Sequence, residues 1–208
     1  MLVVDAHPSA DSLCASLAAA YVEEARSAGA PVRSLVLRDL AFDPILHQGY
    51  RAEQPLVPDL VDASEAILAA RHLVFVYPTW WGTYPALLKG FLDRVLLPGF
   101  AFRFTGPAAW DKLLTGRSAR LVVTLDWPVW AHHLIQGAPG RKAMARATLG
   151  FCGVGPVRAT ELSPAGRADE RQREAFFARV RADARRDARG LPRAAIAPPV
   201  LVPGGSAR

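Results

Sequence analysis

Two patterns of hydrophobic residues take turns along this chain: short unbroken runs, and residues that recur at helical spacing. The middle of the chain holds the clearest example of both. The residues from Leu73 to Tyr77 are hydrophobic without interruption, which is typical of a parallel strand covered on both faces. After a loop, hydrophobic residues recur at helical spacing from Leu87 to Val95, and Pro85 suits the first turn of that helix. We therefore expect a strand, a loop and a helix, with the loop at the strand end where open α/β sheets bind ligands.

The same alternation extends over most of the sequence. Further strands are expected at residues 2–6, 31–40, 120–125 and 154–162, and further helices at residues 13–28, 60–70, 140–149 and 168–189. Strands and helices that alternate in this way predict an α/β fold, in which a parallel sheet is doubly wound, with helices on both faces and right-handed crossovers.

Three stretches fall outside this pattern. Residues 39–54 show no hydrophobic period, and Phe100, Phe102 and Phe104 alternate in a segment that either covers the site or belongs to the core. From residue 191 to 208, prolines and a glycine pair cannot continue a helix. We expect this segment to be a loose or extended tail, with packing on a neighbouring subunit as the alternative.

The turn after the first strand carries candidate chemistry. His7 ends that strand, and Ser12 stands where a helix should begin. A helix start aims backbone N–H groups and the positive end of the helix dipole at one point, which suits a phosphate. A plain capped helix with a loop histidine is the competing interpretation. A second loop with polar and aromatic residues, Asp126 and Trp127, follows the strand at 120–125.

Composition narrows the function classes. The formal net charge is +6, but acidic residues are interleaved with the basic ones of the last helix, which argues against a nucleic-acid partner. The two cysteines, Cys14 and Cys152, form no CxxC motif or zinc set and are expected to be small buried residues in a reducing compartment. No signal peptide or membrane-spanning segment is recognisable, so we expect no membrane insertion and a cytoplasmic location.

Four motifs together give a family resemblance. They are HPSADSLCASL after the first strand, FDPIL near Phe42, FVYPTWWGTYPALLKGFLDRVLLPGFAF in the middle, and GAPGRKAMARATLGFCGVGPVR from Gly137. Over residues 1–165 the chain resembles the flavodoxin-like NAD(P)H:quinone oxidoreductases, and LDWPVW after Thr124 resembles their bacterial branch. The resemblance implies a flavodoxin-like five-stranded sheet in the order 2-1-3-4-5, a bound FAD or FMN, and a homodimer with the active site at the interface. The domain is expected to span residues 1–190.

The flavin-binding candidates follow from the resemblance, whereas the substrate-pocket and catalytic candidates come from the nearby loops and have no secure match in it. The residues that it matches to the flavin phosphates are His7, Ser12, Leu13 and Cys14. Those that it matches to the flavin ring are Pro78, Thr79, Trp80, Trp81 and Gly82, followed by Thr124 and Asp126 in the next loop. The substrate-pocket candidates are Trp127, Trp130 and Phe104. His132 and His133 are the catalytic candidates, although a histidine pair in a polar loop is also typical of a solvated surface.

The implied activity is a two-step transfer. NAD(P)H gives a hydride to flavin N5 and leaves, and a quinone, or a nitroaromatic or azo compound, then takes two electrons in the same slot. No metal is expected. The alternative function is a flavin-bound ancillary subunit of a potassium efflux system, in which binding to a membrane protein is the function.

Overall fold

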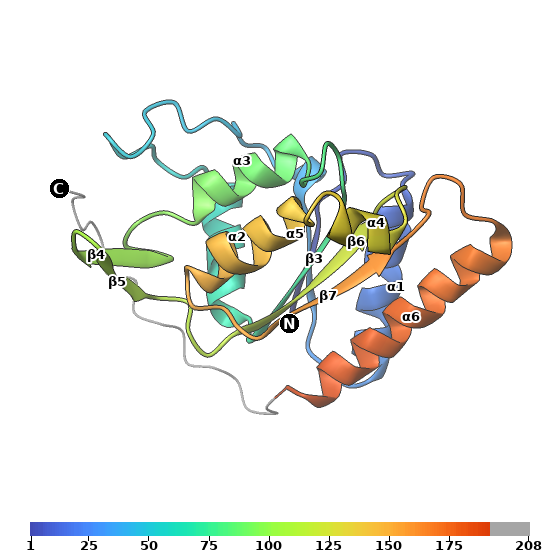
Figure 1. The fold of residues 1–208 in the computed structure, drawn as a ribbon. Coiled ribbons are helices and arrows are strands. Elements are labelled where there is room, and N and C mark those ends of the chain that lie inside the picture. Colours follow the sequence, from blue (N-terminus) through green and yellow to red (C-terminus); the bar gives the residue numbers. More distant parts are fainter. Residues whose placement is uncertain (192–208) are drawn as a thin grey trace.

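The computed structural model of the protein describes residues 1–191 as one α/β domain (Figure 1). The predicted tail, from residue 192 onward, lies outside the described residues. Within residues 1–191, no helix combines the length and the hydrophobicity that crossing a bilayer requires.

A parallel sheet forms the centre of the described chain, with its strands in the order β2-β1-β3-β6-β7. Counted within this sheet alone, that order is the predicted 2-1-3-4-5. The strands are β1 (Leu2–Asp5), β2 (Arg33–Val36), β3 (His72–Pro78), β6 (Ser118–Thr124) and β7 (Val157–Leu162). All seven residues of β3 are buried, because the strand has neighbours on both edges and helices over both faces. This burial explains its unbroken hydrophobic sequence.

Helices cover both faces of the sheet (Figure 1). On one face α1 and α6 pack side by side, and their inward residues form a core with Val74, Val76 and Val122. On the other face α2, α3 and the segment from α5 onward pack over Phe75 and Leu121. The helices are α1 (Leu13–Ser27), α2 (Pro58–Ala69), α3 (Ala86–Val95), α4 (Val129–Leu134), α5 (Pro139–Lys142), the π-helix η2 (Ala143–Gly150) and α6 (Glu170–Arg189).

Several element boundaries differ from the sequence prediction. The second strand ends at Val36, because a 3₁₀ turn, η1 (Leu37–Asp39), follows it. The fifth strand begins at Val157 rather than at residue 154, directly after Pro156, which has no N–H to donate. Helix α4 occupies a segment where we expected only a loop.

The phenylalanine stripe belongs to an antiparallel hairpin outside the main sheet. Its strands are β4 (Phe102–Gly106) and β5 (Ala109–Lys112). Phe102 is buried and contacts Phe151, whereas Phe104 is 60% exposed. The stripe is therefore divided, with Phe102 in the core and Phe104 outside it. The hairpin lies at the end of the molecule opposite to α4 (Figure 1).

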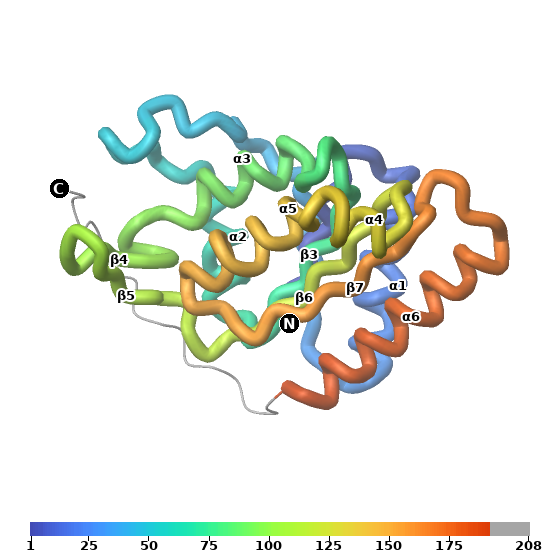
Figure 2. The backbone as a smooth tube through the Cα atoms, in the orientation of Figure 1, coloured from blue at the N-terminus to red at the C-terminus, as the bar shows by residue number. Residues whose placement is uncertain are grey.

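The irregular stretch between η1 and α2 packs against α3 and is hydrogen-bonded to it (Figure 2). Arg94, buried in α3, donates hydrogen bonds to the carbonyl oxygens of Asp43 at 2.6 Å and Pro55 at 3.0 Å. Gly90 of the same helix packs so closely that a Cβ there would lie 2.3 Å from Pro44 Cβ. The FDP motif is thus a packing motif in this structure, with its proline against a glycine of α3.

A buried polar network joins α6 to the sheet. Arg120 of β6 forms a bidentate ion pair with Asp187, and its Nη1 donates to Thr160 Oγ1 at 3.0 Å. Thr160 Oγ1 in turn donates to Asp183 at 2.6 Å, and His72 Nε2 lies 3.3 Å from Asp187. Burial opposes ionisation of Asp187, but the hydrogen bonds from Arg120 and Tyr21 and the adjacent His72 outweigh it and hold the pKa of Asp187 well below its usual range.

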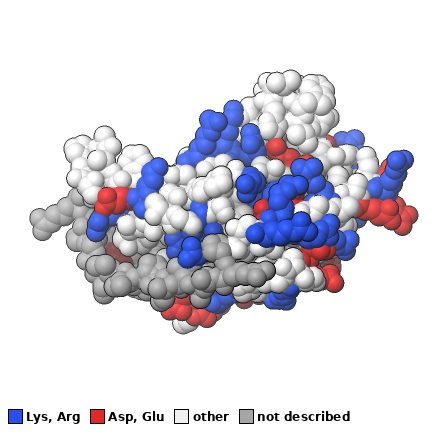
Figure 3. Space-filling view, turned by 90° about the horizontal axis from the view of Figure 1, so that it is seen from below, with Lys and Arg blue, Asp and Glu red and all other residues white. Residues whose placement is uncertain are grey.

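The exposed face of α6 carries charges of both signs. Arg185 pairs with Glu24 of α1 at 2.8 Å, and Arg179 and Arg186 lie within 3.4 Å of the buried Asp183. Figure 3 shows acidic side chains among the basic ones on the face seen from below. The arginines of this helix therefore serve partly to pair with carboxylates of the same domain.

Candidate functional site

Two cavities lie next to each other at the carboxyl end of the sheet. The smaller has a volume of about 330 Å³ and the larger about 620 Å³. Both are lined by Thr79, Leu125 and Asp126, which follow β3 and β6 directly. Because β3 and β6 pair in parallel up to Pro78 and Thr124, their following loops meet at this edge. The two loops therefore line both cavities and lie at the boundary between them.

The smaller cavity lies at the start of α1. Ser12 is the N-cap, and its Oγ accepts the N–H of Ala15 at 3.1 Å. The N–H groups of Leu13 and Cys14, also at this cavity, belong to the first turn and have no partner within the helix. Arg173 of α6 lies at the same cavity and adds a positive charge, while Asp11 adds a negative one. Backbone donors and a guanidinium at one point form a site for an anion.

His7 is held in one orientation at this cavity. Its Nδ1 accepts the N–H of Ser9 at 3.0 Å, which leaves Nε2 to carry the proton in the neutral ring. The ring meets Trp80 edge to face at 5.5 Å. Asp5 accepts the N–H of His7 at 3.2 Å and pairs with Arg38 at 2.5 Å, which fixes the backbone. The ring therefore has a donor available for a ligand.

Cys14 is a structural rather than a reactive residue. Its side chain is buried, and Sγ lies 3.3 Å from Thr124 Oγ1, joining α1 to the end of β6. Burial raises the pKa of the Cys14 thiol to about 12, although the hydrogen bond to Thr124 acts in the opposite direction. The pKa of the buried Cys152 is likewise raised, to about 11. Both thiols are therefore protonated near neutral pH.

The loop after β3 forms one wall of the larger cavity. The N–H of Trp80 donates to Thr83 O at 2.8 Å, and the N–H of Thr83 donates to Trp80 O at 3.0 Å. Trp81 and Gly82, between them, both have positive φ, at 51° and 76°. This is the geometry of a tight hairpin turn, in which Gly is favoured and Trp is strained. The turn holds the Trp81 side chain fully in solvent.

Helix α4 and the start of α5 form the facing wall, with Trp127, His132, Gln136 and Pro139. His132 is buried, and its Nδ1 lies 2.9 Å from Gln136 Oε1, an acceptor. The ring therefore donates from Nδ1, and Nε2 is left as the acceptor in the neutral form. The neighbouring His133 faces a different partner, with its Nε2 2.7 Å from Glu161.

Gly140 brings the two walls together. Its N–H donates to Gly82 O at 2.8 Å. A Cβ on Gly140 would lie 2.6 Å from Thr83 Cα and 2.7 Å from Gly82 O, both backbone atoms. The glycine is thus required by the close approach of α5 to the loop after β3.

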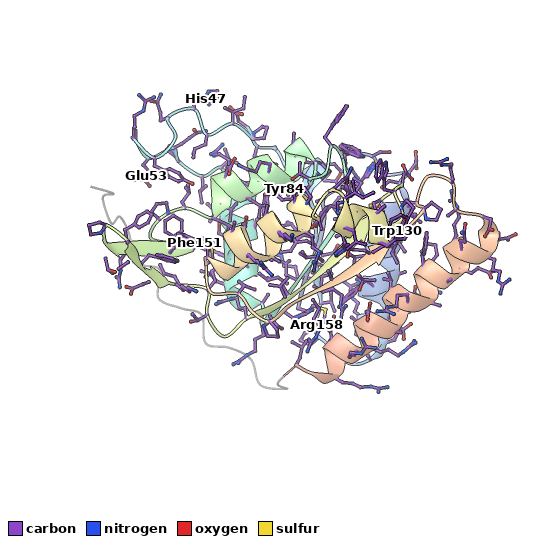
Figure 4. The ribbon with its side chains drawn as sticks, in the orientation of Figure 1. His47, Glu53, Tyr84, Trp130, Phe151 and Arg158 are labelled. Carbon is purple, nitrogen blue, oxygen red and sulfur yellow. The ribbon has the colours of Figure 1, made fainter. Side chains whose placement is uncertain are left out.

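Most of the predicted site residues meet at these two cavities. The residues brought together are His7, Ser12, Leu13, Cys14, Pro78, Thr79, Trp80, Trp81, Gly82, Thr124, Asp126, Trp127 and His132. Three others line neither cavity. Trp130 is 65% exposed on α4 (Figure 4), His133 faces Glu161, and Phe104 is on the distant hairpin.

Sequence reasoning missed Gln136, Gly140 and Arg173. Gln136 lies two residues beyond the end of α4, and its contact with His132 depends on how the chain turns there. Gly140 and Arg173 carry no local signal, because their roles depend on contacts with distant segments.

Comparisons with known proteins agree with this geometry. The model of the family described as having a flavodoxin-like fold matches residues 1–185. An uncharacterized NAD(P)H oxidoreductase of Haemophilus influenzae is 37% identical over 106 residues, which cover 49% of this chain and 52% of that protein. The chain thus spans about half of that relative's length.

Two further proteins align over more of their length. FMN-dependent NADH:quinone oxidoreductase 2 of Pseudomonas fluorescens is 30% identical over 163 residues, 71% of this chain and 78% of that protein. The solved structure of an NAD(P)H:quinone oxidoreductase from Methanothermobacter marburgensis superimposes with a TM-score of 0.75 and 26% identity, covering 88% of this chain and 96% of the other.

Proposed function

The chain belongs to the flavodoxin-like fold family, and from this premise we propose that it is a flavin-dependent NAD(P)H oxidoreductase acting on quinones or similar acceptors. A bound flavin supplies two-electron chemistry, because its N5 accepts a hydride from NAD(P)H and returns the electrons to a second substrate. The observation that carries the proposal is the pairing of the cavities. A site for an anion opens beside a slot walled by tryptophans, across the shared residues Thr79, Leu125 and Asp126.

The donor set of the site fits a flavin. The amides of Leu13 and Cys14 and the ring of His7 would hold the phosphate end, and Arg173 would add charge. Residues 78–82 would hold the flat ring, beside the loop that follows Thr124. We propose FMN ahead of FAD, because the Pseudomonas relative is named as FMN-dependent and the smaller cavity, at about 330 Å³, suits a single phosphate.

Of the two histidines, we propose His132 as the one that handles a proton. Reduction of a quinone by hydride requires an added proton as well, and a side chain at the acceptor can take this proton from solvent on an acceptor nitrogen and pass it to the quinone oxygen. His132 lines the larger cavity with Nδ1 fixed by Gln136, whereas His133 contacts Glu161. NAD(P)H and the acceptor would occupy this cavity in turn.

A homodimer is part of the proposal. Large hydrophobic side chains around the larger cavity are exposed: Trp81 at 102%, Leu134 at 80% and Ile135 at 67%. Exposed groups of this kind next to a cavity are typical of a contact surface, so a second copy of the chain would cover them. Light scattering after gel filtration tests this part of the proposal, and a monomeric mass would contradict it. The cytoplasmic location stays a prediction from the sequence.

The first experiment is an absorbance spectrum of the purified protein, before and after NADH or NADPH is added without oxygen. We expect flavin bands that bleach on addition of the nicotinamide, and mass spectrometry of the released cofactor distinguishes FMN from FAD. A protein that is colourless and takes up neither flavin would overturn the proposal. The named relatives are oxidoreductases, so we do not propose the ancillary subunit of a potassium efflux system.

The histidine assignment has its own test. We expect His132→Asn to lower kcat with a quinone by about a hundredfold or more, the low end for loss of a general acid or base. His133→Asn is the matched control and should retain kcat within about twofold. Equal losses of kcat in both variants would contradict the assignment.

A further inference from the structure

One acidic side chain, Glu161 of β7, lies beneath the wall of the larger cavity formed by residues 128–142. Its Oε2 is 2.7 Å from His133 Nε2 in α4 and 3.9 Å from Arg141 Nε in α5. The same carboxylate thus reaches both helices of the wall, one on each side of the turn that joins them.

The wall needs such ties because it has little stability of its own. Helix α4 has six residues, far below the length at which an isolated helix is stable in water. Helix α5 continues directly into η2, but the non-helical residues 136–138 separate it from α4. Ala138, between them, is buried in a left-handed conformation with φ of 48°, which costs about 1 kcal/mol or more for a residue other than glycine. Tertiary contacts must therefore hold this segment in place.

The surroundings of Glu161 strengthen its interactions. Its side chain is 11% exposed, and Oε1 has no hydrogen-bond partner within the described chain. In the sheet, Val123 of β6 pairs with Tyr77 of β3 on one side and with Glu161 of β7 on the other. Tyr77 is fully buried, and its hydroxyl also has no hydrogen-bond partner among residues 1–191. Burial first, and then the charges of Tyr84 and Glu161, raise the pKa of Tyr77. A carboxylate shielded from water interacts more strongly with the adjacent guanidinium.

The wall carries the side chains that meet the substrate in the proposed function. His132, Gln136 and Pro139 line the larger cavity from residues 128–142, whereas the anion site at α1 is formed by other segments. We propose that Glu161 is a positioning residue that fixes this wall, and so sets the affinity for substrates of the larger cavity without taking part in flavin binding. This inference rests on the proposed function.

Kinetics of three variants test the proposal. Glu161→Ala removes both contacts, and we expect KM for the quinone and for NAD(P)H to rise about tenfold. Glu161→Gln keeps an acceptor for His133 but removes the charge next to Arg141, so its KM values should rise by about two- to threefold. In both variants, the flavin dissociation constant and the rate of flavin reduction at saturating NAD(P)H should stay within about twofold of the wild-type values. Glu174→Gln, on the exposed surface of α6, is the matched control.

Hydrogen exchange supplies a readout that needs no activity. In Glu161→Ala we expect the amides of residues 128–142 to exchange at least about tenfold faster, with those of α1 unchanged. If Glu161→Ala does not fold, Glu161→Gln and Arg141→Gln are compared instead, and each should speed exchange in the same segment. Unchanged exchange and unchanged KM would overturn the inference, as would parallel loss of flavin and substrate affinity. A wild-type protein without flavin would overturn the proposed function alone, because exchange would still report the anchoring.

Discussion

The hydroxyl of Tyr21, in the middle of α1, donates a 2.6 Å hydrogen bond to Asp187 near the end of α6. Both side chains are buried, and Asp187 also receives the guanidinium of Arg120 from β6. One carboxylate thereby joins two helices and the central sheet. A buried charge that satisfies several donors is costly to remove, because the donors lose their partner without regaining water.

Asp187→Asn should therefore destabilise the protein strongly. We expect a loss of about 3–5 kcal/mol in the free energy of unfolding, the range for breaking a buried ion pair on one side. Urea unfolding measures this value. The matched control is Asp93→Asn, which breaks the exposed pair with Lys89 and should cost less than about 1 kcal/mol. Similar losses in the two variants would show that burial adds nothing to the Asp187 pair.

Acid should weaken the same network. The pKa of Asp187 is held below its usual range in the folded protein, so its contribution is fully present above the unfolded pKa of about 3.9 and is lost as the pH falls through the lower folded pKa. The stability difference between wild type and Asp187→Asn should be constant above about pH 5 and should shrink below about pH 4. A difference that instead shrinks toward alkaline pH would contradict the assignment.

Gly140→Ala should disturb the loop after β3. The new Cβ would overlap backbone atoms of Gly82 and Thr83 at 2.7 Å and 2.6 Å, so the loop must move. Overpacking of this kind costs about 1–3 kcal/mol, and we expect flavin affinity to fall by about tenfold or more. Quenching of flavin fluorescence measures the affinity. Gly190→Ala, whose nearest contact would be an ordinary 3.6 Å, should bind like wild type.

The two thiols should be unreactive in the folded protein. Burial raises the pKa of Cys14 to about 12 and that of Cys152 to about 11, so little thiolate is present at pH 8. We expect a thiol reagent to leave both thiols of the native protein unmodified during a reaction time in which it modifies both thiols of the denatured protein. Rapid modification of Cys14 in the native protein would show that the start of α1 opens readily.

Trp81→Ala should separate stability from binding. The side chain is fully exposed in a single copy of the chain, so we expect the free energy of unfolding of the monomer, measured at high dilution, to change by no more than about 0.5 kcal/mol. An aromatic contact is worth about 0.5–1.5 kcal/mol, so KM for NAD(P)H should rise by about two- to tenfold. Trp110→Ala provides the contrast, because that ring stacks on Phe151 at 4.6 Å and its loss should lower stability instead. An unchanged KM would remove Trp81 from the proposed substrate slot.

The main elements could be predicted because their signals are local. The central residues of β3 are hydrophobic without a break because both faces of the strand are covered. Ser12 caps α1 by accepting a hydrogen bond from Ala15, which is only three residues further along the chain. The strand order was implied by the family resemblance, and the observed order confirms it.

Short elements and close approaches could not be predicted in the same way. Helix α4 is too short to show a hydrophobic period, and the hairpin formed by β4 and β5 exposes Phe104, which breaks the expected alternation. Gly140 and Glu161 act through segments about 60 and 30 residues away in the sequence, so no neighbouring residue reveals their contacts. The roles of the site residues themselves stay predictions.

The strand order also has a consequence during synthesis on the ribosome. Strand β3 gains β1 as a neighbour at once, but its other edge is covered by β6, which emerges only after α3 and the hairpin have been made. During that interval β3, all of whose residues are buried in the folded domain, presents an unpaired edge. A nascent chain that stalls before residue 118 would therefore be a substrate for chaperones, and release from them should coincide with the emergence of β6.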